Sequence, residues 1–237
     1  RGGAGEATPV WVRRRGGRYM AGYRALRERY SLLEVCAEPE LAVAVTLQPV
    51  DVIDVDAAIL FSDLLVPFTP MGLVFDFVKG EGPSVENPVR TPAAVDALRR
   101  FEPREALDHV LETIRILRRE LDGRVPLIGF GGAPFTMASY AIEGAPSTTY
   151  ARTKAFMYAQ PAAWHRLCSR FADMMAEIDR SCRRQKTFAL IMEPTQRFEL
   201  NGSIQDHGMV ASAKPIQPRK TLSVPILDDD SALRQMH

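Results

Sequence analysis

The sequence predicts an α/β fold built on a parallel sheet, and three observations support this fold. Residues 55–66 are apolar without a clean alternation, which is typical of a strand buried on both faces, and residues 125–144 begin with a short apolar run that predicts a second buried strand. Residues 103–121 lie between them and carry apolar side chains at helical spacing. A second strand that runs into a glycine-rich turn and a helix makes two strand-to-helix units in succession, which predicts parallel strands.

The remaining elements follow from local patterns. Residues 23–30 are charged and helical in character, and residues 39–50 open with Pro-Glu and have the apolar positions of a buried helix. Residues 72–89 predict a short alternating strand or a hairpin that ends in a Gly/Pro loop. Gly123 is expected to end the helix of residues 103–121.

The pattern changes near Met175. Residues 176–237 contain prolines, charges and polar residues without a sustained period, and their apolar run FALIM is short. We therefore expect two parts: residues 1–175, which fold, and residues 176–237, which form an irregular and poorly ordered tail.

Composition narrows the class of protein. The chain has 237 residues, of which 46% are hydrophobic, and 30 Lys and Arg residues balance 29 Asp and Glu residues. This balance argues against a nucleic-acid or membrane-surface partner, and no apolar run approaches the ~18 residues that span a bilayer. The three cysteines are far apart, which predicts ordinary thiols in a reducing compartment. We expect a cytoplasmic protein, or an organellar one whose transit peptide has been removed.

Arginines gather in the segment WVRRRGGRYMAGYR, residues 11–24, which holds five of them. Arg14 and Arg18 are four residues apart and flank Gly16 and Gly17, so a bent backbone can aim both guanidinium groups at one polycarboxylate. The alternative is that these side chains are solvated loop charges.

Three further features each have two interpretations. Asp63 follows the first strand, where it either caps a helix or serves a site at the carboxyl end of the sheet. Tyr140 is either a core tyrosine or a site residue. The turn GFGGAP, residues 129–134, does not match a phosphate-binding loop in register, so close packing or a bulky ligand is favoured. His109 is expected to be solvated, and nothing supports a catalytic triad or a paired-histidine metal site.

Three segments, in order, resemble the uroporphyrinogen decarboxylase family. PVWVRRRGGRYMAGYR is similar to the signature PVWxMRQAGRYxPEYR, and VDAAILFSDLLVP resembles the strand that carries the family's site aspartate. GFGGAPFTMASYAIEG resembles the block G-F-x-G-A-P-[FW]-T-x-x-x-Y. The resemblance covers residues 9–175.

This resemblance implies a (β/α)8 TIM barrel, usually a homodimer, that works without a metal or an organic cofactor. Such an enzyme removes carbon dioxide from the four acetate side chains of uroporphyrinogen and forms coproporphyrinogen in haem and tetrapyrrole biosynthesis. The catalytic residues it implies here are Asp63, Arg14 and Tyr140. The substrate-binding residues it implies are Arg14, Arg18, Gly17, Asp63 and Tyr140.

The sequence also departs from the family. Arg13, Arg15 and Gly16 stand where Met, Gln and Ala are usual, and Ala21-Gly22 replaces Pro-Glu. The family's D-S-W segment and late histidine block are not recognisable after Met175. We therefore expect an incomplete barrel that corresponds to its first half. Two hypotheses stay open: a decarboxylase whose second half has diverged, and a truncated or frame-shifted, inactive fragment that acts as a binding or interaction module. A third, a cobalamin- and zinc-dependent methyltransferase, lacks the late His and Cys ligands it would need.

Overall fold

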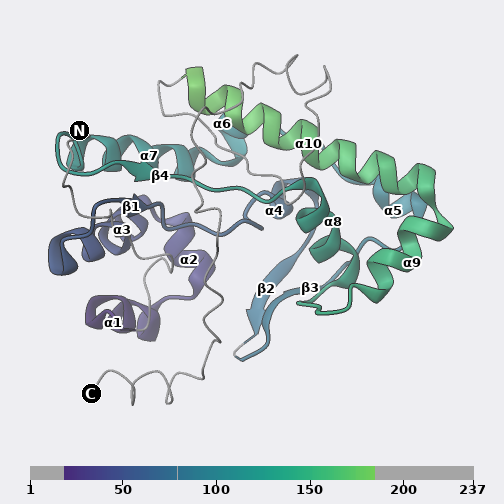
Figure 1. The fold of residues 1–237 in the computed structure, drawn as a ribbon, viewed down its shortest axis with the longest axis horizontal. Helices are drawn as coiled ribbons and strands as arrows, with labels where there is room; N and C mark the ends of the chain where they lie inside the picture. The colour runs from purple at the N-terminus through teal and green to yellow at the C-terminus, as the bar shows by residue number, and fades with distance from the viewer. Residues whose placement is uncertain (1–18, 79, 185–237) are drawn as a thin grey trace, which may run out of the picture. The chain divides into compact units, whose positions relative to one another are not determined.

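The computed structural model describes residues 19–78 and 80–184 (Figure 1). All of them belong to one of two compact units, residues 1–193, and the second unit, residues 194–237, lies outside the described residues. Most of the predicted tail therefore cannot be compared with the structure. Its first residues can: helix α10, Pro161–Arg184, continues without a break through Met175, so the expected boundary falls inside a helix.

Three helices open the described chain: α1, Ala21–Arg29; α2, Leu32–Ala37; and α3, Pro39–Ile53. Helix α2 begins with a capping box, in which the Ser31 hydroxyl accepts the backbone N–H of Glu34 and the Glu34 carboxylate accepts the backbone N–H of Ser31. Helix α3 has proline at its first position and packs against α7 and β1. Both helices that the sequence predicts in this region are confirmed.

The parallel pairing predicted from the two strand-to-helix units is confirmed. Strand β1, Ala58–Ile59, pairs in parallel with β4, Leu127–Ile128, with Ala58 opposite Leu127. Both strands are much shorter than predicted, because the chain leaves the sheet after Leu60 and turns at Asp63. The expectation that the second strand is buried is wrong, since Ile128 of β4 is 37% exposed.

Residues 72–89 form the predicted hairpin. Strand β2, Phe75–Val78, pairs in antiparallel with β3, Gly82–Val85, and Phe75 lies opposite Val85. Helix α4, Phe68–Met71, precedes the hairpin and ends at Gly72 with φ +93°, a conformation that favours glycine. Phe68 packs edge-on against Phe75, so the hairpin is joined to the core through these two rings.

The helix predicted over residues 103–121 is two helices: α6, Pro103–Ala106, and α7, Asp108–Glu120. The backbone of Leu107 departs from helical geometry at φ −122° and ψ 24°, while its side chain stays buried. Gly123 lies in the turn beyond α7 with φ +70°, in agreement with its predicted role. Buried side chains of α3, β1 and α7 form one hydrophobic cluster.

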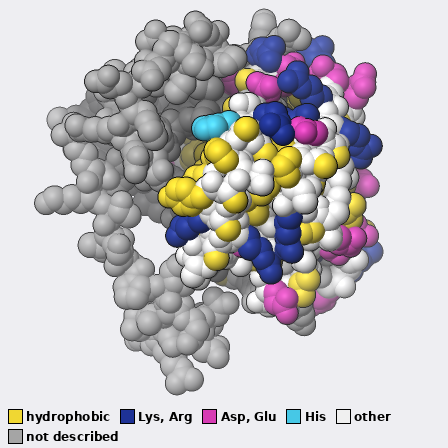
Figure 2. All heavy atoms as spheres, turned by 90° about the vertical axis from the view of Figure 1, so that its right-hand side faces the viewer, with side chains coloured by type: hydrophobic (Ala, Val, Ile, Leu, Met, Phe, Trp, Pro, Cys, Tyr) yellow, Lys and Arg dark blue, Asp and Glu magenta, His cyan; other side chains and the backbone are white. Residues whose placement is uncertain are grey.

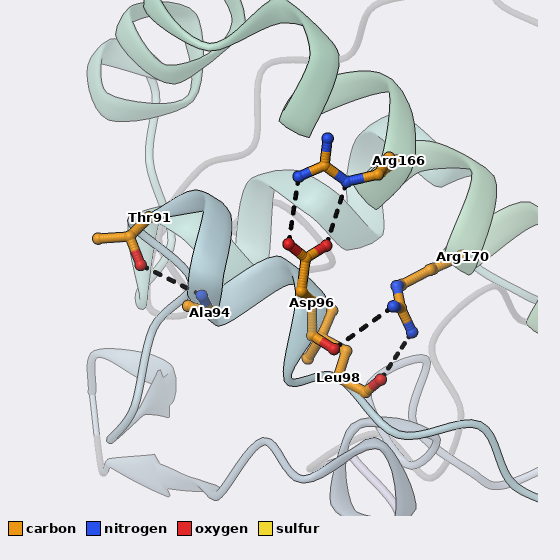
Figure 3. Close-up of polar contacts among 6 residues, drawn as sticks. All are labelled: Thr91, Ala94, Asp96, Leu98, Arg166 and Arg170. Carbon is orange, nitrogen blue, oxygen red and sulfur yellow. Dashed lines mark hydrogen bonds and ion pairs between the residues drawn. The ribbon is translucent and has the colours of Figure 1, made fainter.

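A second, larger cluster surrounds α8, Pro134–Glu143, and the long helix α10, with α9, Ala151–Ala159, between them in sequence. Figure 3 shows how α10 holds the short helix α5, Pro92–Asp96. Arg166 makes two hydrogen bonds to the Asp96 carboxylate, and Arg170 donates to the carbonyl oxygens of Asp96 and Leu98. These contacts satisfy carbonyl groups at the end of α5 that have no partner within the helix.

Figure 2 shows one face of the described chain, on which hydrophobic side chains gather among charged ones. Large hydrophobic side chains that the described chain exposes include Phe135, Tyr150 and Tyr158. Within residues 19–184, no helix combines the length and the apolar character needed to cross a membrane.

Candidate functional site

The parallel pairing brings two loops to the same edge of the sheet. Because β1 and β4 run in the same direction, the segment that contains Asp63 and the turn of residues 129–134 both leave from the carboxyl ends of their strands. In open and closed α/β sheets, this edge is where ligand sites form.

Asp63 is half-buried and lies in a tight turn. Its Oδ1 accepts the backbone N–H of Leu65 at 2.8 Å, and its carbonyl oxygen accepts the N–H of Val66 at 3.2 Å. This contact lies within a turn and is not the helix cap that the sequence left open, because the next helix, α4, has Pro67 as its N-cap residue and no side-chain cap. It is compatible with a site role, because the turn contact fixes the orientation of the carboxylate beside α8.

Tyr140 lies on α8, the helix that follows β4, and is also half-buried. Burial raises the pKa of its phenol above the usual 10.0, and the negative charges of Asp63 and Tyr150 raise it further. The phenol is therefore protonated at neutral pH and can donate a hydrogen bond. The charge effect also places Asp63 and Tyr150 each within electrostatic reach of Tyr140.

A cavity of about 100 Å³ adjoins Tyr140 at the junction of α8 and α9. Five of its lining residues carry a hydroxyl group: Thr136, Ser139, Tyr140, Ser147 and Tyr150. The Ser139 hydroxyl donates to the Phe135 carbonyl oxygen at 2.8 Å and is used within the helix. These hydroxyl groups are neutral, and much of the remaining lining is apolar.

Glu143 is the acidic residue of this cavity, and it stabilises the start of α9. It is 9% exposed, and its Oε1 accepts both the backbone N–H and the hydroxyl of Thr153, each at 2.9 Å. Arg90 and Arg152 donate to the Glu143 carbonyl oxygen at 3.4 and 3.3 Å. Sequence reasoning missed Glu143 and Tyr150. The Ser-Thr-Thr run before Tyr150 could have indicated a helix start there.

Gly131 and Gly132, in the turn of residues 129–134, serve packing. A Cβ added at Gly131 would overlap the end of the Met175 side chain, and one added at Gly132 would overlap Met137, which is fully buried. These contacts support the packing interpretation of the turn.

Several other expectations can be compared with the structure. His109 is half-buried, contrary to the prediction that it is solvated, and burial lowers its pKa. Cys36, Cys168 and Cys182, all in the described ranges, form no disulfide. Burial raises the pKa of the Cys168 thiol to about 11, which fits an ordinary thiol. In the described ranges, no three His, Cys, Asp or Glu side chains are grouped as metal ligands would be. Arg14, Gly17 and Arg18 lie outside the described residues, so their roles stay predictions.

Comparison with known proteins gives one consistent family. The family model described as uroporphyrinogen decarboxylase (URO-D) matches residues 1–187. Curated proteins named uroporphyrinogen decarboxylase include one from Sorangium cellulosum, 52% identical over 176 residues, which are 74% of this chain and 50% of that protein. One from Carboxydothermus hydrogenoformans is 56% identical over 166 residues, 70% of this chain and 47% of that protein. The chain spans about half the length of the curated relatives it matches.

A solved structure also resembles the chain. A methyltransferase from Methanosarcina mazei superposes with a TM-score of 0.50 at 20% sequence identity, covering 67% of this chain and 46% of that one. At this identity the likeness concerns the fold alone.

Proposed function

Because the chain belongs to the uroporphyrinogen decarboxylase family, we propose that it provides the first half of a (β/α)8 barrel and binds a tetrapyrrole carboxylic acid at the carboxyl ends of β1 and β4. One observation carries this proposal: Asp63 and Tyr140 come from different strand-to-helix units and lie within electrostatic reach at that edge. Residues about 77 positions apart in the sequence are thereby available to one ligand.

The reaction proposed for the family site is a decarboxylation that uses the pyrrole ring as an electron sink. Protonation of a ring carbon makes the pyrrole cationic. The bond between the acetate methylene and its carboxylate then breaks, its electrons neutralise the ring, and carbon dioxide leaves. Protonation of the methylene carbon forms a methyl group, and the ring carbon releases the proton that it had taken up, which restores the pyrrole. The step that needs stabilisation is the formation of the cation.

Asp63 and Tyr140 have properties that suit this chemistry. An ionised Asp63 would accept hydrogen bonds from pyrrole N–H groups and stabilise the positive charge as it develops; such oriented groups typically contribute a few kcal/mol. Tyr140, protonated at neutral pH, would donate a hydrogen bond to a substrate carboxylate. Arg14 and Arg18 are proposed to bind further carboxylates through bidentate contacts.

A second candidate is a binding module without turnover. The family model matches only as far as residue 187, although the chain continues to residue 237. This favours the module, because a decarboxylase site built at the centre of a barrel draws on residues from both halves. Dimer formation is likewise a proposal from the family.

The test is the substitution Asp63→Asn in the 237-residue chain. The asparagine carbonyl can still accept the Leu65 N–H, so the turn persists while the negative charge is lost. We expect binding of uroporphyrinogen, kept reduced under anaerobic conditions, to weaken roughly 10-fold, as for a lost charge-assisted hydrogen bond.

The matched control is Asp122→Asn, an exposed aspartate on the amino-terminal side of β4. If Asp63→Asn and the parent chain bind uroporphyrinogen with equal affinity, the proposed role of Asp63 in the site is refuted. Release of carbon dioxide, measured in the same samples, separates the two candidates: turnover supports the decarboxylase, and binding without turnover supports the module.

A further inference from the structure

Thr46 is a buried polar residue of α3 that the proposed reaction does not use. It is 3% exposed. Its hydroxyl donates a hydrogen bond to the carbonyl oxygen of Ala42 at 2.7 Å, one turn earlier in the same helix. The same oxygen accepts the backbone N–H of Phe61 at 2.9 Å. Thr46 therefore joins α3 to the segment that carries Asp63.

The two hydrogen bonds of Thr46 depend on each other. A threonine inside a helix commonly donates to the carbonyl oxygen four residues earlier. A hydroxyl group has one hydrogen, and the bond to Ala42 uses it, so the oxygen is left as an acceptor. Helix α3 thus orients the Thr46 hydroxyl to receive the Phe61 N–H.

The Phe61 N–H lies where the chain leaves the sheet. The N–H of Leu60 donates to the carbonyl oxygen of Ile128 in β4 at 2.9 Å. Successive residues of a strand direct their N–H groups to opposite edges, so the Phe61 N–H faces away from β4. Among the described residues, no strand pairs with that edge of β1. The Thr46 hydroxyl supplies the acceptor that this buried N–H needs, and it fixes the direction in which the chain departs.

The side chain of Phe61 is held as well. It is 4% exposed, and its ring lies edge-on to that of Tyr23 in α1, with centroids 5.6 Å apart. Two residues later, Oδ1 of Asp63 accepts the N–H of Leu65 at 2.8 Å. The backbone of Asp63 is therefore held on its amino-terminal side through Phe61 and on its carboxy-terminal side by the turn.

We propose that Thr46 is a positioning residue, whose hydroxyl holds Phe61 so that the Asp63 carboxylate is aligned with the pyrrole N–H groups of a bound tetrapyrrole. This inference rests on the proposed function. Thr46 is buried and its hydroxyl is used within the protein, so it acts through Asp63. Without the hydroxyl, the buried Phe61 N–H regains a partner only if the segment shifts, and the carboxylate two residues later shifts with it.

The test is binding of uroporphyrinogen, kept reduced under anaerobic conditions, to the 237-residue chain. Thr46→Val replaces the hydroxyl with a methyl group of similar size and removes both hydrogen bonds. Thr46→Ser keeps the hydroxyl and removes only the methyl group. Both substitutions of Thr46 are also made in the Asp63→Asn background.

The matched control is Thr113→Val. Thr113 is a threonine of α7 that is 1% exposed, and its hydroxyl donates to the carbonyl oxygen of His109 at 2.8 Å, one turn earlier. Within the described ranges, this hydroxyl has no hydrogen bond to another element. Thr113 therefore shares the burial and the helical contact of Thr46, without the link to a second segment.

We expect Thr46→Val to weaken uroporphyrinogen binding roughly 5-fold, within the range of one net hydrogen bond. Thr46→Ser should stay within about 2-fold of the parent chain because it keeps the hydrogen bonds, although the lost buried methyl group lowers its melting temperature. Thr113→Val should leave the affinity unchanged. In the Asp63→Asn background, Thr46→Val should cause less than about 2-fold further loss, because the carboxylate that Thr46 positions is already gone.

Three results overturn the inference while leaving the proposed function standing. They are parent-like affinity of Thr46→Val, an equal loss in Thr46→Ser, and a loss in Thr46→Val that is the same with and without the Asp63 carboxylate. If circular dichroism shows that Thr46→Val does not fold, Thr46→Cys replaces it, since a thiol of similar size is a weak acceptor. If the parent chain does not bind uroporphyrinogen, or if Asp63→Asn binds it equally well, the proposed function and the inference fall together.

Discussion

The contact between Glu143 and Thr153 offers the sharpest test of the structure, through the substitution Glu143→Ala. This change removes the acceptor of two hydrogen bonds, from the N–H and the hydroxyl of Thr153, which is fully buried. Each buried donor left without a partner costs about 1–3 kcal/mol. The adjoining cavity of about 100 Å³ has room for water that can satisfy one of them.

We therefore expect the free energy of unfolding to fall by about 2–3 kcal/mol in Glu143→Ala, which is near the lower end of the combined cost of the two unpaired Thr153 donors. For a chain of this length, each kcal/mol corresponds to a fall in melting temperature of roughly 2–4 °C. Glu143→Gln keeps an acceptor oxygen and should cost only about 1 kcal/mol, the difference between a charged and a neutral acceptor.

The assay is urea denaturation followed by circular dichroism. The dependence of the unfolding free energy on urea concentration is compared between variants, because a change in midpoint reports a change in stability only if this slope is unchanged. Thr153→Val in both backgrounds completes a double-mutant cycle, and the exposed Glu120→Ala is the surface control. If Glu143→Ala costs no more than Glu120→Ala, or if the cycle finds no coupling, the buried carboxylate does not hold the start of α9.

Two further predictions concern other parts of the fold. Burial lowers the pKa of His109 below 6.5, so the unfolded chain binds more protons than the folded chain just below that pH, and the free energy of unfolding should fall as the pH decreases through this range. Thermal melts at several pH values should show that His109→Asn flattens this dependence. The control His165→Asn, at an exposed histidine, should not flatten it. Gly132→Ala should lower the free energy of unfolding by about 1–3 kcal/mol, because the new methyl group overlaps the buried Met137 side chain. Gly131→Ala should lower it less, since the flexible end of the Met175 side chain can move. Equal urea midpoints for the two variants would contradict this reasoning.

Local patterns in the sequence were enough to predict much of the fold. The helix of residues 39–50, the hairpin of residues 72–89 and the parallel pairing of two strand-to-helix units all follow from periodicity and turn residues, and all are present. These features depend on neighbours within a few positions, which the sequence displays directly. Three ordered motifs also identified the family, which the comparisons confirm.

Tertiary contacts decided the rest. Apolar composition predicted a strand over residues 55–66, but hydrogen bonds to β4 reach only a few of them before Asp63 turns the chain. The helix of residues 103–121 is interrupted because the buried Leu107 adopts a non-helical backbone. The positive φ of Tyr150, the carboxylate of Glu143 at α9 and the cavity between them arise where α8 and α9 meet. No local pattern encodes them, because each depends on the free energy of contacts between separate elements, and those contacts exist only once the chain has folded.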